Sequence, residues 1–411
     1  MRLLYFVQYF YPEKCSGGDL VLDLLEGYAK HGWNVDVYTP TPTRGVSDAV
    51  RKEYKQKGTE KLYGGRVTIH RMPLYREGKG FIVRAVRYII FSLQCLWKGL
   101  REPAEVIFTG SGPPSQGVIV GIIKRLTGKC FVYNLQDIFP DSMIAAGIAE
   151  ENDFLVKIGR KMERFSYDSA DAIITVSEDM KSNILNKGVE ADKVIVVPNW
   201  IGVDKIKPIP REENALFEAL GLTRDAFYVT YAGNLGYMQG LDSVIRAAKY
   251  LRNDPQIQFV LFGNGSEEEK IRAMVEEFEL SNVTVFPLQS AERLSEVYSL
   301  GDVSLVSCRP GTGQAGMPSK TALIMAAGTP VLGYFDMPSE FSRVLKEAEA
   351  GWCVPAGEEE QLANTIRKLA DNPKKCAVYG QNGAAYVHDK LSRGPAVARY
   401  IEVIEKSAAQ E

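Results

Sequence analysis

The stretch Cys308–Asp336 carries residue types suited to binding a phosphate group. Its glycines permit backbone dihedrals and a close approach to a ligand that side chains forbid. An apolar strand precedes the loop, and a short helix that ends at Gly328 is expected to follow it. Lys320 lies in the first turn of that helix, where free N–H groups and a cation together suit an anion. The other residues of this candidate site are Gly311, Gly313, Gly316, Pro318 and Ser319.

Further glycine-bearing loops follow other expected strands in both halves of the chain. A single loop of this kind is explained by a tight strand-to-helix turn. Their recurrence favours a ligand site, because ligands of doubly wound sheets bind outside the carboxyl ends of the strands. A polar loop, Gln136–Asp141, also follows one of these strands. The residues concerned are Gly17, Gly18, Gly110, Gly112, Gly233, Asn234, Gly236, Gly263 and Gly265.

The elements that must position these loops alternate between short apolar runs and amphipathic stretches. This alternation predicts an α/β fold in which parallel strands are joined by right-handed crossovers. Two successive series of strands predict two doubly wound, Rossmann-like domains that face each other across a cleft. Residues 41–65 contain few apolar side chains and are expected to form a loop, and Asp242 is expected to cap a helix. Strands are expected at 3–7, 34–38, 67–71, 106–108, 130–134, 172–176, 194–197, 228–231, 257–262, 283–286 and 303–306.

Composition narrows the class of protein. A chain of 411 residues exceeds what one core usually supports, so two domains are expected. A formal net charge of -2 gives no reason to expect a nucleic-acid partner. Six cysteines occur without a Cys-x-x-Cys pair, which favours a reducing cytoplasm over secretion. We expect no membrane span, because no run of 18 apolar residues occurs.

A dinucleotide fingerprint is the first alternative. Gly311, Gly313 and Gly316 spell Gly-x-Gly-x-x-Gly after a strand, and Asp336 lies 20 residues beyond the last glycine. This is the pattern of a nicotinamide dinucleotide site. The motif lies deep in the second half of the chain rather than in the first βαβ unit, which disfavours an oxidoreductase.

Several motifs, taken in order, carry a resemblance to a known family. They are Tyr9–Pro12 with Gly17–Gly18, Gln136–Asp141, Glu163–Arg164, Ala170–Ser177, Val197–Trp200, Tyr231–Gly236, Phe262–Gly265, Met317–Lys320 and Ala326–Pro330. In this order they resemble the GT-B glycosyltransferases of retaining family 4, above all the bacterial enzymes of O-antigen and capsule biosynthesis that transfer amino sugars. The resemblance covers nearly the whole chain.

The resemblance implies a reaction and a division of labour. Residues 1–200 would bind the acceptor, a polyprenyl-linked glycan, and residues 201–385 a nucleotide diphosphate sugar, UDP-linked or similar and often N-acetylated. Residues 386–411 would form a helix that packs back on the first domain. Lys320 would stabilise the departing diphosphate, with Ser319 and Gly233–Gly236 beside it. Asp137 matches a position near the reacting carbon; the alternative is that it caps a turn.

The resemblance also implies what is absent. No cofactor is expected, and no metal, since the chain contains no Asp-x-Asp motif and its three histidines form no ligand cluster. Many relatives carry two glutamates where this chain has Ala315 and Leu323, the second of which usually grips the nucleotide ribose. An arginine and a lysine of relatives correspond to Asn234 and Gln239. A non-catalytic sugar-nucleotide binding protein would explain Ala315 and Leu323 and is one alternative. A nucleotide-sugar 2-epimerase of the same fold is another; it would need paired carboxylates and a histidine in the cleft, and the small number of histidines argues against it.

The segment 76–101 could bring the protein to a membrane. Apolar residues fall on one helical face and cations on the other, which is typical of a helix lying on anionic lipid. An ordinary helix packed on the sheet, with solvated cations, is the alternative. The expected location is the cytoplasm, peripheral to the inner face of the plasma membrane. The apolar positions are Ile82, Val86, Ile89, Leu93, Leu96 and Leu100, and the opposite polar ones Arg84, Arg87, Gln94, Lys98 and Arg101.

Overall fold

The chain divides into two compact units. The computed structural model describes residues 1–13, 18–77, 81–145, 149–200, 206–313, 318 and 320–410. Unit 1 joins Met1–Asn199 to Gly394–Glu411, and unit 2 comprises Trp200–Arg393. Unit 1 first ends at Asn199, beside the domain boundary expected at residue 200. The C-terminal segment that belongs to unit 1 begins at Gly394, whereas the sequence predicted residue 386.

Unit 1 is built on an eight-stranded sheet in the order β3-β4-β2-β1-β5-β6-β7-β8. All of its neighbouring strands pair in parallel except β3 and β4. The strands are β1 Arg2–Phe6, β2 Asn34–Pro40, β3 Thr59–Leu62, β4 Val67–Met72, β5 Val106–Gly110, β6 Cys130–Leu135, β7 Ala172–Thr175 and β8 Val194–Val196. The helices are α1 Gly18–Lys30, α2 Asp48–Lys57, α3 Phe81–Arg101, α4 Ser115–Thr127, α5 Asp141–Ala145, α6 Phe154–Ser169, α7 Glu178–Asn186 and α16 Arg393–Ala408.

The prediction of a loop at residues 41–65 is wrong for most of that segment. Helix α2 and the antiparallel edge strand β3 lie there. The Ser47 side chain caps α2 by accepting a hydrogen bond from the Val50 N–H, and Tyr54 is buried beneath it. An edge strand and a surface helix need few apolar residues, so the polar composition concealed both.

Unit 2 is built on a parallel six-stranded sheet in the order β11-β10-β9-β12-β13-β14. Tyr228 and Ala232 of β9 enter one core cluster while Val229 and Tyr231 enter another, so both faces of the strand are covered. Its strands are β9 Phe227–Ala232, β10 Ile257–Phe262, β11 Val283–Phe286, β12 Val303–Ser307, β13 Val331–Phe335 and β14 Gly351–Pro355. Its helices are α8 Leu216–Ala219, α9 Leu241–Tyr250, α10 Glu268–Glu277, α11 Leu294–Tyr298, α12 Lys320–Ala326, α13 Glu340–Glu347, α14 Glu359–Ala370 and α15 Pro373–Tyr386.

Helix α3 agrees with the sequence at its apolar positions and differs at Arg87. Arg87 is fully buried, as is Phe91, so the prediction that Arg87 lies on the opposite, polar face is wrong. Val86, Ile89 and Leu93 are exposed, which disagrees with the alternative that this face packs on the sheet. No helix in the described part of the chain has the length and hydropathy needed to cross a membrane.

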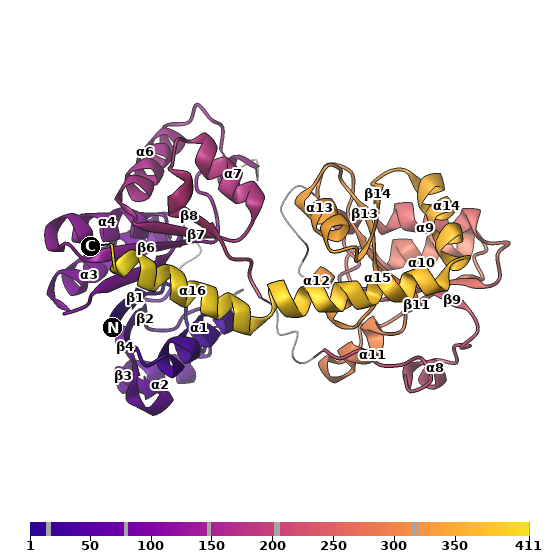
Figure 1. The fold of residues 1–411 in the computed structure, drawn as a ribbon, viewed down its shortest axis with the longest axis horizontal. Helices are drawn as coiled ribbons and strands as arrows, with labels where there is room; N and C mark the ends of the chain where they lie inside the picture. The colour runs from indigo at the N-terminus through magenta and orange to yellow at the C-terminus, as the bar shows by residue number, and fades with distance from the viewer. Residues whose placement is uncertain are drawn as a thin grey trace. The chain divides into compact units, whose positions relative to one another are not determined.

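The last helix, α16, packs within unit 1 (Figure 1). The Tyr400 hydroxyl donates a hydrogen bond of 3.0 Å to the Asn134 side chain at the end of β6. Gly27 of α1 faces Val397 so closely that an added Cβ atom would lie 2.2 Å from a Val397 methyl group. Contact between α1 and α16 therefore depends on the absence of a side chain at Gly27.

Gly27→Ala tests this contact. We expect the free energy of unfolding to fall by about 1–3 kcal/mol, because the new methyl group overpacks the interface. Urea unfolding measures the change, and Val397→Ala in the same protein should restore part of the loss. Gly394→Ala is the matched control, since nothing lies within 4 Å of a Cβ atom added there. Equal stabilities of the Gly27 and Gly394 variants would contradict the packing.

Candidate functional site

Two glycine-bearing loops meet at the carboxyl ends of β9 and β10 in unit 2. The Gly233 N–H donates to the Phe262 carbonyl at 2.9 Å, and the Leu235 N–H donates to the Asn264 carbonyl at 2.9 Å. A Cβ atom added to Gly263 would lie 2.0 Å from the Gly233 carbonyl oxygen. The structure therefore brings these loops together, and backbone contact between them requires glycine.

Asn234 fills the space between the two loops. A Cβ atom at Gly265 would lie 2.5 Å from the Asn234 Oδ1 atom, and one at Gly236 would lie 2.7 Å from its Nδ2 atom. Gly233 itself has a φ of +147°, a conformation that favours glycine. The predicted donor residues Gly233, Asn234, Gly236, Gly263 and Gly265 thus form one compact surface of backbone and one amide side chain.

Lys320 lies beside this surface on an aromatic ring. Its Nζ atom is 3.9 Å from the centroid of the Tyr231 ring and 3.7 Å from the position of a Cβ atom at Gly233. Burial lowers the pKa of Lys320 from its ordinary value to about 7. No carboxylate of the described chain pairs with it. A desolvated cation without a carboxylate partner has a strong affinity for an anion.

Tyr231 is a functional candidate that the sequence analysis missed. The residue is fully buried, and its hydroxyl donates a hydrogen bond of 2.7 Å to the Asn234 carbonyl. The ring therefore supports the ammonium group of Lys320 while its hydroxyl fixes the neighbouring glycine loop. Its place at the carboxyl end of β9, two residues before Gly233, is the signal that could have identified it.

The glycine-rich loop that follows β12 is held by Asp336. The carboxylate of Asp336 accepts hydrogen bonds from the Gly311 N–H at 3.0 Å and the Gly313 N–H at 2.8 Å. In a dinucleotide site this acidic residue would instead hydrogen-bond a ribose hydroxyl. Because Asp336 is engaged by the loop itself, the structure disfavours the dinucleotide alternative.

Arg309 fixes the other side of the same loop. Its Nη2 atom donates to the Asp242 carboxylate at 3.0 Å, and its guanidinium lies 4.0 Å from the Tyr237 ring centroid. Burial would raise the pKa of Asp242, but Arg309 and the nearby cations of α9 and α10 lower it. Asp242 therefore lies in the first turn of α9 as an ion-pair partner, and Gly240 occupies the cap position where Asp242 was expected.

Other predicted residues fall at or near this site. The Pro318 carbonyl accepts a hydrogen bond of 2.9 Å from the Thr321 N–H, at the start of α12. Leu323 packs partly buried against the core of unit 2. Helix α12 has only seven residues, so its dipole would add little to a candidate anion site, and Lys320 would supply the positive charge. The predicted residues Gly17, Gly316 and Ser319, and the position Ala315, lie outside the described residues.

Two predicted residues lie in unit 1. Gly18 is the first residue of α1, after β1. Asp137 follows β6 and is exposed; its carboxylate accepts a hydrogen bond of 3.0 Å from the Ser142 hydroxyl. No backbone N–H of the described residues donates to that carboxylate, so it does not act as a turn cap there. Both residues lie at the carboxyl side of the unit 1 sheet.

A metal centre has no candidate ligands among the described residues. They contain no group of three or more histidine, cysteine, aspartate or glutamate side chains arranged to hold an ion. The candidate anion site of unit 2 offers Lys320, the Asn234 amide and backbone groups of the glycine loops.

Asp336→Asn tests how the glycine-rich loop is held. We expect amide hydrogen exchange in Cys308–Gly313 to become about tenfold faster or more. The asparagine side chain has one oxygen in place of two, so one of the two loop N–H groups loses its acceptor. Mass spectrometry of peptides covering the loop measures the rate. Asp371→Asn is the control, since this exposed aspartate at the end of α14 makes no ion pair or side-chain hydrogen bond with described residues. Unchanged exchange in the Asp336 variant would refute the role.

Comparison with known proteins identifies the class to which this arrangement belongs. Residues 18–200 match the model of the glycosyl transferase 4-like domain, and residues 212–386 match that of the glycosyl transferases of group 1. The chain is 28% identical over 391 residues to WcaI of Escherichia coli K12, named as a colanic acid biosynthesis glycosyl transferase. That match covers 91% of this chain and 93% of WcaI.

Two further proteins extend the comparison. WbjE of Pseudomonas aeruginosa, named as a glycosyltransferase, is 23% identical over 69% of this chain and 70% of its own. The crystal structure of Anabaena HepE with UDP superposes with a TM-score of 0.70 at 15% identity, over 99% of this chain and all of HepE. The two family models together span both units, and the chain belongs to the GT-B glycosyltransferases, with a 4-like domain followed by a group 1 domain.

Proposed function

We propose that this glycosyltransferase transfers a sugar, with retention of anomeric configuration, from a nucleotide diphosphate donor to a lipid-linked glycan. Unit 2 binds the donor and unit 1 the acceptor. The observation that carries the donor assignment is the desolvated Lys320 ammonium on the Tyr231 ring, beside the glycine loops. HepE has been crystallised with UDP and with UDP-glucose, which supports UDP as the nucleotide.

The transfer reaction requires stabilisation of the departing diphosphate. The bond from the anomeric carbon to the diphosphate oxygen breaks, and the acceptor hydroxyl oxygen bonds to that carbon and passes its proton to the departing diphosphate. Negative charge therefore grows on the diphosphate, where the Lys320 ammonium group can stabilise it. We assign Asp137 to the sugar or to the acceptor hydroxyl. No cofactor or metal ion is required by this scheme.

Colanic acid is the polymer named for the relative WcaI, which favours a polysaccharide precursor as the acceptor. The donor sugar, hexose or N-acetylhexosamine, is set by contacts that the described residues do not distinguish. Leu323, at the position where relatives carry the ribose-binding glutamate, packs on the core and offers no polar group. The ribose must then be held by other groups, such as loop N–H donors.

A panel of nucleotide sugars tests the donor assignment. We expect slow release of UDP from one of UDP-glucose, UDP-galactose and their N-acetylated amino-sugar counterparts. Lys320→Met should lower that rate by roughly a hundredfold, because it removes the cation opposite the growing charge. A coupled assay for UDP measures release, and circular dichroism checks folding.

Lys346→Met is the control, since Lys346 is exposed on α13 and makes no ion pair with described residues. An unchanged rate in the Lys320 variant would refute its role. Tight binding without release would favour a non-catalytic binding protein, and isomerisation of the bound sugar at carbon 2 would favour an epimerase.

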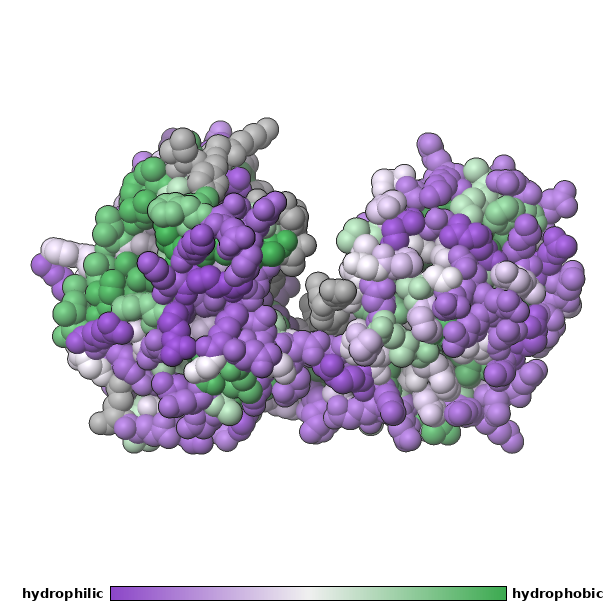
Figure 2. Space-filling model, turned by 90° about the horizontal axis from the view of Figure 1, so that it is seen from above, coloured by the Kyte–Doolittle hydropathy of each residue, from purple (hydrophilic) through white to green (hydrophobic). Residues whose placement is uncertain are grey.

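Unit 1 also carries a surface suited to a lipid-linked substrate. Figure 2 shows a wide hydrophobic area over one face of this unit. Along α3, exposed apolar side chains recur every three or four residues, and Leu126 of the neighbouring α4 is 67% exposed. Neither α3 nor α4 contains an aspartate or glutamate. The exposed apolar residues of α3 are Val83, Val86, Ile89, Leu93, Trp97 and Leu100.

Cations accompany this apolar face of α3 and α4. Arg84, Arg101 and Arg125 are exposed, and the Arg101 guanidinium lies 3.3 Å from the Trp97 ring centroid. An apolar stripe with cations and no acidic residues complements an anionic bilayer. We infer that this face, within the segment 76–101 and α4, holds the enzyme peripherally at the cytoplasmic membrane surface.

Vesicle binding tests the membrane contact. We expect the protein to cosediment with vesicles of phosphatidylglycerol and phosphatidylethanolamine, and less strongly as salt rises. Leu93→Glu with Trp97→Glu should reduce binding roughly tenfold or more, because both side chains are more than half exposed and would meet the acyl region. Val378→Glu, on an equally exposed apolar residue of α15, is the control. Equal binding of the two variants, or self-association through this face without lipid, would contradict the proposal.

A further inference from the structure

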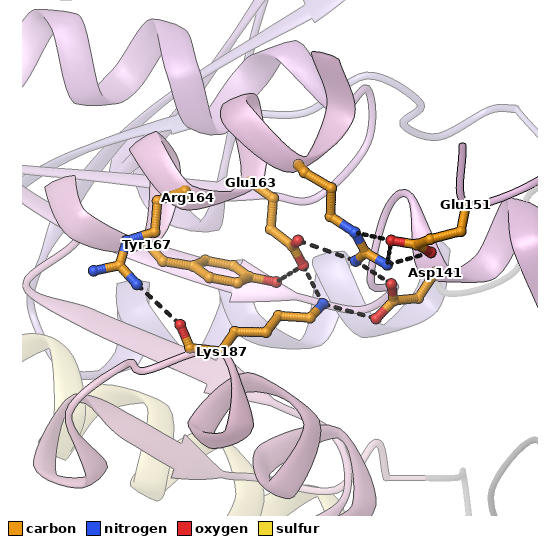
Figure 3. Close-up of polar contacts among 7 residues, drawn as sticks. Asp141, Glu151, Glu163, Arg164, Tyr167 and Lys187 are labelled. Atoms are coloured by element: carbon orange, nitrogen blue, oxygen red, sulfur yellow. Dashed lines mark hydrogen bonds and ion pairs between the residues drawn. The ribbon is translucent and has the colours of Figure 1, made fainter. Parts of the chain in front are cut away.

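Unit 1 contains a network of charged side chains that the proposed mechanism does not use. Figure 3 shows the side chains of Asp141, Glu163 and Lys187 pointing toward one another from α5, α6 and the end of α7. The Lys187 Nζ atom lies 2.7 Å from the Asp141 carboxylate and 2.5 Å from that of Glu163. Glu163 is 8% exposed, so a single ammonium group joins two carboxylates at the edge of the unit 1 core.

A second cation closes the network. Arg160 pairs with the other oxygen of Asp141 and lies 3.0 Å from Glu151 and 3.4 Å from Glu163. Burial would raise the pKa of Asp141, but Lys187 and Arg160 lower it. The Tyr167 hydroxyl donates to Glu163 at 3.1 Å. The carboxylates of Asp141 and Glu163 are therefore each held from more than one direction.

The network is attached directly to the loop that carries Asp137. Helix α6 packs on that loop so closely that a Cβ atom at Gly159 would lie 2.8 Å from Phe139 and 3.2 Å from Pro140. Asp141 begins α5, and the next residue, Ser142, donates the 3.0 Å hydrogen bond to the Asp137 carboxylate. Fixing Asp141 therefore fixes the donor that orients Asp137.

Two cavities border the network. Glu163 and Tyr167 line a polar cavity of about 350 Å³ together with Arg160 and Lys187. The same two residues, with Asp137, also line a smaller cavity of about 10 Å³, the size of one water molecule. Glu163 thus lies between the outer network and the space beside Asp137.

We propose that Lys187 is a positioning residue for the transfer reaction, and that it acts through Asp141 and Ser142 on the carboxylate of Asp137. Glu163 holds the Lys187 ammonium group in place. Glu163 is buried, and Asp141, Lys187 and Arg160 are partly buried. Desolvating these charges costs free energy that apolar packing would not, which favours a role in geometry over one in stability. The proposal rests on the proposed function of Asp137.

Lys187→Met tests it, with UDP-glucose as the probe donor and UDP as the binding probe. We expect kcat for UDP release to fall roughly tenfold to a hundredfold, because a displaced reacting group is costly, while KM and the affinity for UDP stay unchanged. Asp137→Asn with Lys187→Met should be no slower than Asp137→Asn alone, since both changes act on one group. Lys187→Arg, which keeps the cation, should restore most of the rate.

A second measurement is independent of turnover. Hydrogen exchange of residues 136–142 in the ligand-free protein should become about tenfold faster in Lys187→Met and stay unchanged in Asp168→Asn. Asp168→Asn removes the exposed Arg164–Asp168 ion pair of α6, the helix that carries Glu163, and changes none of the ion pairs of Lys187. Additive losses in the double variant, or unchanged exchange in Lys187→Met, would overturn the proposal. If the wild-type protein released no UDP, the proposed function would fail for this donor, and the exchange experiment would still decide the role of Lys187.

Discussion

The contact between the Lys320 ammonium group and the Tyr231 ring is the interaction on which the donor site depends. A partly buried cation that pairs with no carboxylate of the described residues costs free energy in the empty protein, and this desolvation lowers the pKa of Lys320 to about 7. An anion placed beside it removes that cost. The surrounding glycines matter because they let two backbone loops contact each other beside this ammonium group; a Cβ atom at Gly263 would lie 2.0 Å from the Gly233 carbonyl oxygen.

The sheet of unit 2 and the ion pairs around it fix the loops of the candidate donor site. Parallel strands end at one edge of the unit 2 sheet, so three separate loops meet there. Asp336 fixes the third loop from one side and Arg309 fixes it from the other. Ion pairs also hold a site segment of unit 1, where Lys187 and Arg160 pair with Asp141 at the start of α5, the short helix that follows Asp137.

Much of this arrangement could be predicted from sequence, and the exceptions have physical causes. Glycines after apolar runs predict the loops around Gly233 and Gly263, because only glycine allows the backbones of these loops to come into contact. Asp336 fits a dinucleotide fingerprint by its spacing, and the sequence disfavours that interpretation only by the place of the motif in the chain. Spacing alone does not show that the carboxylate already accepts two hydrogen bonds from the loop. Arg87 was placed on a polar face although it is buried, because helical periodicity identifies a stripe without showing which side meets the sheet. The sequence assigns no role to Tyr231 or Lys187, because the contacts of Tyr231 with Lys320 and of Lys187 with Asp141 and Glu163 join residues far apart in the chain.

The most direct test of the account is the number of protons taken up when UDP binds. At about pH 8 the Lys320 amine of the free protein is mostly neutral, and a bound diphosphate favours its charged form. Titration calorimetry in buffers of different ionisation enthalpy should therefore show uptake of about one proton by the wild-type protein. Lys320→Met should take up none. No uptake by the wild-type protein, or equal uptake by both proteins, would contradict the assignment of Lys320 to the diphosphate.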